Sequence, residues 1–145
     1  MKEAVVSFLQ GNIGKNCAGH IEGFGAWLNA RILDVKGNGD VLLEFDVREE
    51  MLNPMGTIHG GALAAILDEA MGMQLFVKSS DEDVFFALNI SVDFVKNAKL
   101  GELLTVSTEV VRIGKKTANL KSVIWNSKNE VVAQGSSNFL KVSSI

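Results

Sequence analysis

The chain has 145 residues, of which 47% are hydrophobic and 21% are charged, a composition typical of one compact globular domain rather than of a disordered or fibrous chain. The net charge of -3 and the lack of tyrosine disfavour nucleic-acid binding, which relies on basic surfaces and stacked aromatic rings. A single cysteine, Cys17, and the lack of an apolar leader after Met1 predict a cytoplasmic protein with no disulfide within the chain.

The first half of the sequence predicts a short helix, an irregular loop and a hairpin. Five glycines between residues 11 and 25 indicate the loop. Apolar residues then alternate from Trp27 to Lys36 and from Val41 to Arg48, which is the pattern of half-buried strands. Gly37-Asn38-Gly39 between these two segments predicts a tight turn.

One long helix is predicted from Ile58 to about Val77. Among residues 60–77 only Asp68, Glu69 and Gln74 are polar, so we expect a helix that is buried around most of its circumference. Adjacent carboxylates in mid-helix argue against a membrane span, because each would cost about 2.5–3.5 kcal/mol in a bilayer. The protein is therefore expected to have no membrane partner.

Four further strands are predicted after the helix, at Val84–Phe94, Leu103–Ile113, Thr117–Asn126 and Val131–Val142. In the first of them the even-numbered residues are all apolar, which predicts one apolar face. Short connections between consecutive strands favour an antiparallel meander. The expected fold class is α+β, with one long central helix wrapped by a curved antiparallel sheet of about six strands in a single domain over residues 1–145.

Asp68 is the first candidate for chemistry. Its helical neighbours three, four and seven positions away are all small or apolar, and burial among them would raise the pKa of its carboxyl towards the range of a general base. The competing interpretation is that Asp68 or Glu69 accepts structural hydrogen bonds at an interface. Glu69 points about 100° away around the helix, so we expect that the two carboxylates do not both point at one site.

The helix N-terminus is the second candidate. Up to four backbone amides there lack helical acceptors, and Gly60 and Gly61 would let a substrate oxygen approach them without meeting a Cβ atom. The alternative is an ordinary helix start, with glycines for packing and His59 as a structural hydrogen-bonding residue. His20 and His59 are the only histidines, and no clustering of ligands suggests a metal site.

The segment Asn53-Pro54-Met55-Gly56-Thr57-Ile58-His59-Gly60-Gly61, followed by Asp68-Glu69-Ala70 and Gly72, resembles the signature of PaaI-like hotdog-fold acyl-CoA thioesterases. The resemblance extends from about Trp27 to the C-terminus and leaves the first 25 residues outside. It implies that Asp68 is the general base or nucleophile, that the Gly60 amide polarises the thioester carbonyl, and that Asn53 and His59 position groups around it. A Ser or Thr of related enzymes is replaced here by Ala87.

Hydrolysis of an acyl-CoA to a carboxylic acid and free CoA is the function that these features predict. A thioester has a weakly resonance-stabilised carbonyl and a good thiolate leaving group, so one carboxylate and one oxyanion hole suffice without a metal or cofactor. We expect five residues to contact the substrate: Gly61, Met71, Leu75, Phe85 and Ala87. For the larger side chains among them, core packing is the alternative. The competing classes are a non-catalytic acyl-CoA-binding hotdog module, a hotdog dehydratase or hydratase, and a structural oligomerisation domain.

Helix geometry also predicts an oligomer. Gly60 and Asp68 are eight residues apart, about 12 Å along a helix, whereas one carbonyl must lie within about 3 Å of its oxyanion donor and near its base. Antiparallel packing of two copies would bring Gly60 of one protomer beside Asp68 of the other. We therefore expect a homodimer, with a homotetramer formed as a dimer of dimers as the alternative.

Overall fold

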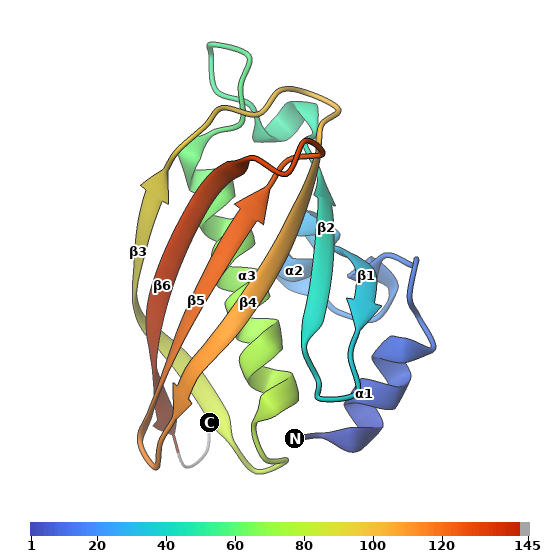
Figure 1. Cartoon of the computed structure of the whole chain (residues 1–145), viewed down its shortest axis with the longest axis vertical. Helices are drawn as coiled ribbons and strands as arrows, with labels where there is room; N and C mark the ends of the chain where they lie inside the picture. The colour runs from blue at the N-terminus through green and yellow to red at the C-terminus, as the bar shows by residue number, and fades with distance from the viewer. Residues whose placement is uncertain (143–145) are drawn as a thin grey trace.

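The computed structural model describes residues 1–142, which form a six-stranded antiparallel sheet curved around one long helix (Figure 1). The helices are α1 (Glu3–Gln10), α2 (Gly23–Leu28) and α3 (Gly60–Lys78), with single 3-10 turns at Cys17–Gly19 and Glu49–Met51. The strands are β1 (Arg31–Val35), β2 (Val41–Asp46), β3 (Val84–Phe94), β4 (Leu103–Ile113), β5 (Thr117–Trp125) and β6 (Val131–Val142). The predicted α+β class, the long helix and the six strands are confirmed.

The strand order in the sheet is β1-β2-β4-β5-β6-β3, and all neighbours are antiparallel. The predicted meander is correct for β1–β2 and for β4–β5–β6, but it is wrong for β3, which pairs with β6. Residues 95–102 carry the chain from β3 at one edge of the sheet back to the middle, beside β2 (Figure 1). A short connection restricts how far the chain can travel, but it does not specify which strand edges become paired.

Helix α3 fills the concave side of the sheet. Its buried residues are Leu63, Ile66, Leu67, Ala70, Met71, Gln74, Leu75 and Val77. The polar member of this set, Gln74, is satisfied because its Oε1 accepts from the Val41 amide at 2.9 Å and its Nε2 donates to the Gly39 carbonyl at 2.8 Å. These bonds hold the turn of the β1–β2 hairpin against the helix.

The helix is not buried around its whole circumference in the single chain. By length and composition α3 could cross a membrane, as the core helices of many soluble proteins could, and here one side of it packs on the sheet. Gly61, Asp68 and Phe76 lie on the other side and are exposed. The prediction of burial on most sides is therefore wrong for one chain, because a single curved sheet covers only one side of a helix.

The segment before β1 also differs from the sequence prediction. A strand was expected from Trp27, but Trp27 and Leu28 end helix α2, and β1 begins only at Arg31. Asn29 ends the helix in a left-handed conformation, with φ 57°, which asparagine tolerates better than most residues. The apolar pattern over residues 27–30 is too short to distinguish the end of a helix from the beginning of a strand.

Strand β3 contains a bulge that changes which side chains face the helix. Ala87 and Asn89 stand opposite consecutive residues of β6, so Leu88 is an extra residue on β3. Consequently Phe85, before the bulge, and Val92, after it, both pack against the core. The predicted face of even-numbered residues is wrong, because an inserted residue inverts the alternation in the rest of the strand.

Candidate active site

A turn formed by residues 53–57 delivers the chain to the start of α3. The Asn53 side chain organises this turn: its Oδ1 accepts from the amides of Met55 at 3.0 Å and Thr57 at 3.2 Å, and its Nδ2 donates to Thr57 Oγ1 at 2.9 Å. The amide of Ile58 donates to the Ala98 carbonyl at 2.8 Å and so ties the turn to the segment after β3. Asn53 is thus a positioning residue for the helix start.

The amide of Gly60 is the free hydrogen-bond donor at the N-terminus of α3. His59 takes up the next three amides, because its Nδ1 accepts from Gly61 at 2.8 Å and its carbonyl oxygen accepts from Ala62 at 2.9 Å and Leu63 at 3.2 Å. Within residues 1–142 the Gly60 amide has no acceptor. A free amide at the positive end of a helix is suited to hold an oxygen that gains negative charge.

Asn53 and Gly60 share a cavity of about 340 Å³ at this end of the helix, lined also by Leu63 and Phe94. A Cβ atom on Gly60 would lie 3.1 Å from Cζ of Phe94, so any larger residue here would push the ring aside by a few tenths of an ångström. Phe94 is not marked as a site residue by the sequence, because its position next to the helix start depends on the course of β3. The one local sign that a large side chain lies against the helix start is the glycine at the first position of the long helix.

Asp68 lies in a second cavity, of about 390 Å³, over the exposed side of α3. The carboxylate makes no hydrogen bond or ion pair with another of the described residues, and although Asp68 is exposed in the single chain, its partial burial in the cavity raises the pKa of its carboxyl. The residues lining the cavity are Ile21, Asp68, Glu69, Gly72, Met73, Phe76, Phe85, Phe86, Ala87 and Phe139. None of these ten carries a hydroxyl group, so Ala87 leaves the carboxylate without the Ser or Thr that the resemblance implies.

Glu69 lines the same cavity but lies against α2. A Cβ atom on Gly25 would come within 2.7 Å of Glu69 Oε1, so the absence of a side chain at residue 25 makes room for this carboxylate. Burial raises the pKa of Glu69, and the charge of Asp68 raises it further. The Cys17 thiol is buried, and both burial and Glu69 raise its pKa, which makes it a poor nucleophile at neutral pH.

The remaining predicted substrate-contact residues lie in the core, in the cavities along α3 and at the exposed start of the helix. Met71 is fully buried in the core, in agreement with the alternative of core packing. Leu75 and Phe85 line a cavity of about 310 Å³ beside the Asp68 cavity. Gly61 is exposed at the helix start, where a Cβ atom would lie 3.0 Å from His59 Nδ1. Ile21 and Phe139 also line the Asp68 cavity, and no local pattern in the sequence marks either of them.

The single chain therefore presents two half-sites rather than one site. Asn53, His59 and Gly60 are together at the N-terminus of α3, and Asp68 and Ala87 are together about two turns further along. No cavity described for residues 1–142 is lined by both Gly60 and Asp68.

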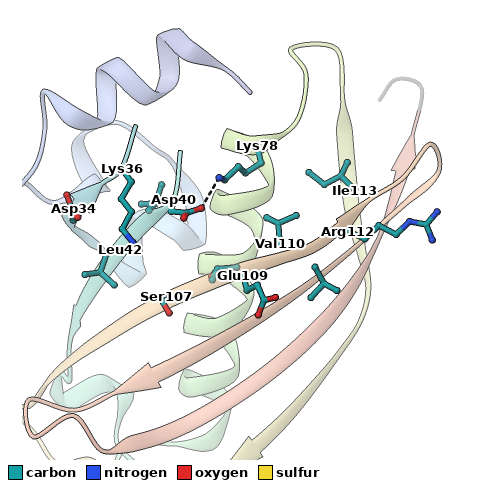
Figure 2. A pocket seen from close by; sticks show the side chains of 13 residues that line it. Asp34, Lys36, Asp40, Leu42, Lys78, Ser107, Glu109, Val110, Arg112 and Ile113 are labelled. Carbon is teal, nitrogen blue, oxygen red and sulfur yellow. Dashed lines mark ion pairs between the residues drawn. The ribbon is translucent and has the colours of Figure 1, made fainter. Parts of the chain in front are cut away.

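The largest cavity, of about 710 Å³, lies elsewhere, between the β1–β2 hairpin and the outer half of β4 (Figure 2). It lies beyond the start of β2, since the pairing of β2 with β4 begins at Leu42 and Ser107 and leaves the rest of β4 without β2 as a neighbour. Its charged side chains include a pair joined at 2.8 Å, Lys78 Nζ and Asp40 Oδ1, and none of the predicted site residues lines it. In the described part of the chain no group of three His, Cys, Asp or Glu residues is placed to hold a metal ion.

The stretch from the turn before α3 to the beginning of β6 matches a known family. Residues 55–133, more than half of the chain, match the family model of the thioesterase superfamily. The chain belongs to the thioesterase superfamily. The matched region contains His59, Gly60 and Asp68, and Asn53 lies two residues before it.

Relatives and solved structures agree with this assignment. Human acyl-coenzyme A thioesterase 13 is 30% identical over 98 residues, which cover 67% of this chain and 69% of that protein. The alignments with the human protein, with its Pongo abelii counterpart and with a putative esterase of Archaeoglobus fulgidus span 66% to 69% of those proteins' own lengths.

Two solved structures show the same fold. The Escherichia coli PaaI protein from the phenylacetic acid degradation operon has a TM-score of 0.80 at 18% identity, and the likeness covers 99% of this chain and 98% of that one. A hypothetical thioesterase protein of Streptococcus pneumoniae with coenzyme A has a TM-score of 0.72 at 24% identity, over 80% of this chain and 88% of that one. These likenesses confirm the hotdog fold.

Replacing Asn53 by alanine is expected to lower turnover by about tenfold to a hundredfold, because the turn that presents the Gly60 amide loses its three side-chain hydrogen bonds. The fold should persist, since the turn lies outside the packed core, and thiol-release kinetics together with the thermal midpoint will separate the two effects. Asn53→Asp is the matched control, because it keeps the oxygen that accepts from Met55 and Thr57. Equal activity of Asn53→Ala and the parent would remove Asn53 from the mechanism.

Proposed function

We propose that this thioesterase-superfamily protein hydrolyses acyl-CoA thioesters, with Asp68 as general base or nucleophile and the Gly60 amide as oxyanion donor. The observation that carries the proposal is the Gly60 amide, left without an acceptor at the N-terminus of α3 while His59 satisfies the next three. The human relative is named as an acyl-CoA thioesterase, and the S. pneumoniae neighbour was solved with coenzyme A, so both names support the substrate class.

The chemistry needs only groups that the chain supplies. In one route Asp68 takes a proton from water, the water oxygen bonds to the carbonyl carbon, the C–S bond breaks and the CoA thiolate takes up the proton. In the other route the Asp68 carboxylate bonds to the carbonyl carbon and expels the thiolate, and water then hydrolyses the mixed anhydride. In both routes the carbonyl oxygen gains charge, which the Gly60 amide stabilises.

The complete site is proposed to form between two protomers. If Gly60 stands opposite Asp68 of the partner subunit, the two antiparallel α3 helices cross at Ala64, and two equivalent sites result. The small residues on the exposed side of α3, such as Gly61 and Ala65, permit close approach of a second helix.

Strand β3 is the sheet edge that supports this dimer. It is 11 residues long and forms one edge of the sheet, where its outer backbone groups have no strand partner among the described residues (Figure 1). Three of its large apolar side chains are about half exposed: Phe86 at 50%, Leu88 at 58% and Phe94 at 59%. A long apolar edge of this kind normally pairs or is covered, so we place the protomer interface along β3 and the open side of α3.

Co-expression of two inactive variants is expected to restore activity if the site is shared. Gly60→Pro removes the amide donor and Asp68→Asn removes the base, and a mixed dimer has one site in which both native residues meet. With random assortment half of the dimers are mixed and each has one intact site, so about a quarter of the parent activity should return. Co-expressed Asp68→Asn and Asp68→Ala should stay inactive, and a lack of recovery in the first mixture would show that each protomer carries its whole site.

Release of free thiol from a panel of acyl-CoAs tests the function directly. The purified parent is expected to release CoA from at least one member of a panel of short, medium and aromatic acyl-CoAs. A parent that binds acyl-CoA but hydrolyses none of the panel would instead identify a non-catalytic binding module.

A further inference from the structure

The cavity that holds Asp68 continues along α3 into the neighbouring cavity of about 310 Å³. The two share four lining residues, Gly72, Phe76, Phe85 and Phe139. The second cavity ends at Ser79 and Asp83, whose polar atoms already have partners: Ser79 Oγ donates to the Phe76 carbonyl at 3.1 Å, and Asp83 pairs with Lys141. An apolar path therefore leads away from the carboxylate, and no unpaired polar group at its far end calls for a polar ligand.

Gly72 stands at the junction of the two cavities. It lies one helical turn after Asp68 on the same side of α3, about 6 Å along the axis. Apart from the two neighbouring residues and the backbone of its own helix, no heavy atom of the described residues lies within 4 Å of the place that its Cβ would occupy. Packing within the chain does not require a glycine here, although glycine in a helix interior is unfavourable relative to alanine.

One wall of the junction is held in place from the N-terminal segment. The Lys2 ammonium lies 3.4 Å from the centre of the Phe76 ring, and the Lys2 amide donates to the Val77 carbonyl at 3.0 Å. Because these contacts hold Phe76, the width of the junction between the two cavities depends on the side chain at residue 72.

We propose that the two cavities accept an apolar acyl group longer than acetyl, and that Gly72 is the residue that admits the chain beyond the thioester. This inference rests on the proposed thioesterase function and names its substrate class. Cavities with a combined volume of several hundred Å³ are of the size that holds small apolar ligands.

The proposed dimer does not offer another role for this glycine. With α3 helices that cross at Ala64, Gly72 lies opposite the turn that precedes the partner's helix rather than opposite the helix itself. Close helix–helix packing therefore accounts for the small residues before Asp68 but not for Gly72.

The test compares kcat/KM for octanoyl-CoA and acetyl-CoA in the parent, Gly72→Ala and Gly72→Leu. The ratio of octanoyl to acetyl should fall at least about tenfold in Gly72→Leu, and less in Gly72→Ala, because discrimination by a few methylenes in an apolar pocket is of this order. Gly37→Leu is the matched control: Gly37 also has no atom within 4 Å of its Cβ position but lies in the β1–β2 turn, so the ratio should not change.

An unchanged ratio in Gly72→Leu, or an equal loss on both substrates, would overturn the role of Gly72. Dissociation of the oligomer in this variant, seen by light scattering, would assign the glycine to the subunit contact instead. If the parent hydrolyses neither of these substrates nor any other acyl-CoA of the panel, the proposed function fails, and the affinities of non-hydrolysable acetyl and octanoyl thioether analogues of CoA take the place of kcat/KM. The ratio of octanoyl-analogue to acetyl-analogue affinity is then expected to fall about tenfold in Gly72→Leu. An unchanged ratio overturns the role of Gly72 whether or not the protein is a thioesterase.

Discussion

Asp68→Asn is expected to lower acyl-CoA turnover by at least about a hundredfold, which is the lower end of what positioned acid–base groups contribute. The amide keeps nearly the same shape but lacks the basic lone pairs and the charge, so neither abstraction of a proton from water nor attack on the carbonyl can proceed from this residue. Affinity for a non-hydrolysable acyl-CoA analogue should change little, because the cavity around Asp68 is almost entirely apolar.

The same substitution should raise the thermal midpoint at neutral pH. Burial raises the pKa of Asp68 in the folded protein, so the folded state favours the protonated carboxyl. The stability from that preference is present below the unfolded pKa and is lost as the pH rises through the folded pKa. The ionised carboxylate is therefore a cost at pH 7, and the gain from Asp68→Asn should shrink in acid. Removal of its charge should also lower the pKa of Glu69, which Asp68 raises.

Glu69→Gln is the matched control for Asp68→Asn, because Glu69 is the adjacent carboxylate in the same cavity and lies against Gly25. It should keep most of the parent's turnover. The measurements are thiol release, analogue binding and thermal midpoint on one preparation of each variant. Undiminished hydrolysis in Asp68→Asn, with loss in Glu69→Gln, would move the base to Glu69.

Gly60→Pro is expected to lower turnover by about a hundredfold or more while Gly60→Ala has a much smaller effect. Proline lacks the amide N–H that the proposed oxyanion hole uses, and loss of one such donor costs about 10²–10³ in rate. The position tolerates proline, because residue 60 is the first of the helix and His59 before it is already extended, with φ -68° and ψ 138°.

Alanine at residue 60 is the control for the steric effect of that change. Both substitutions place a Cβ atom about 3.1 Å from the Phe94 ring, but only alanine keeps the amide. The two variants should therefore have similar thermal midpoints and differ in kcat. An equal loss of kcat in both would show that Phe94, and not the Gly60 amide, accounts for the effect.

The elements that were correctly predicted are those whose signal is local. Strand β3 and the strands from β4 to β6 were placed to within a residue, and the helix start differs by two residues, because alternation and helical periodicity are set by side chains close in the sequence. The same information does not reveal an inserted residue such as Leu88, since a strand with a bulge and a strand without one have equally apolar sequences.

For the candidate site, the sequence by itself determined the residue types and one distance: a glycine-rich helix start, a carboxylate eight residues later, and a separation of about 12 Å that follows from helical rise alone. The structure shows which amide is free: the His59 ring and carbonyl accept from the amides of residues 61–63 through local bonds that span two to four positions, and these leave the Gly60 amide without an acceptor. Only the tertiary structure placed Phe94 over Gly60 and opened the path past Gly72, because both depend on β3 pairing with β6 at the edge of the sheet. That pairing joins residues 39 to 58 positions apart, from Phe94 with Ala133 to Val84 with Val142, and no periodicity within either strand specifies it.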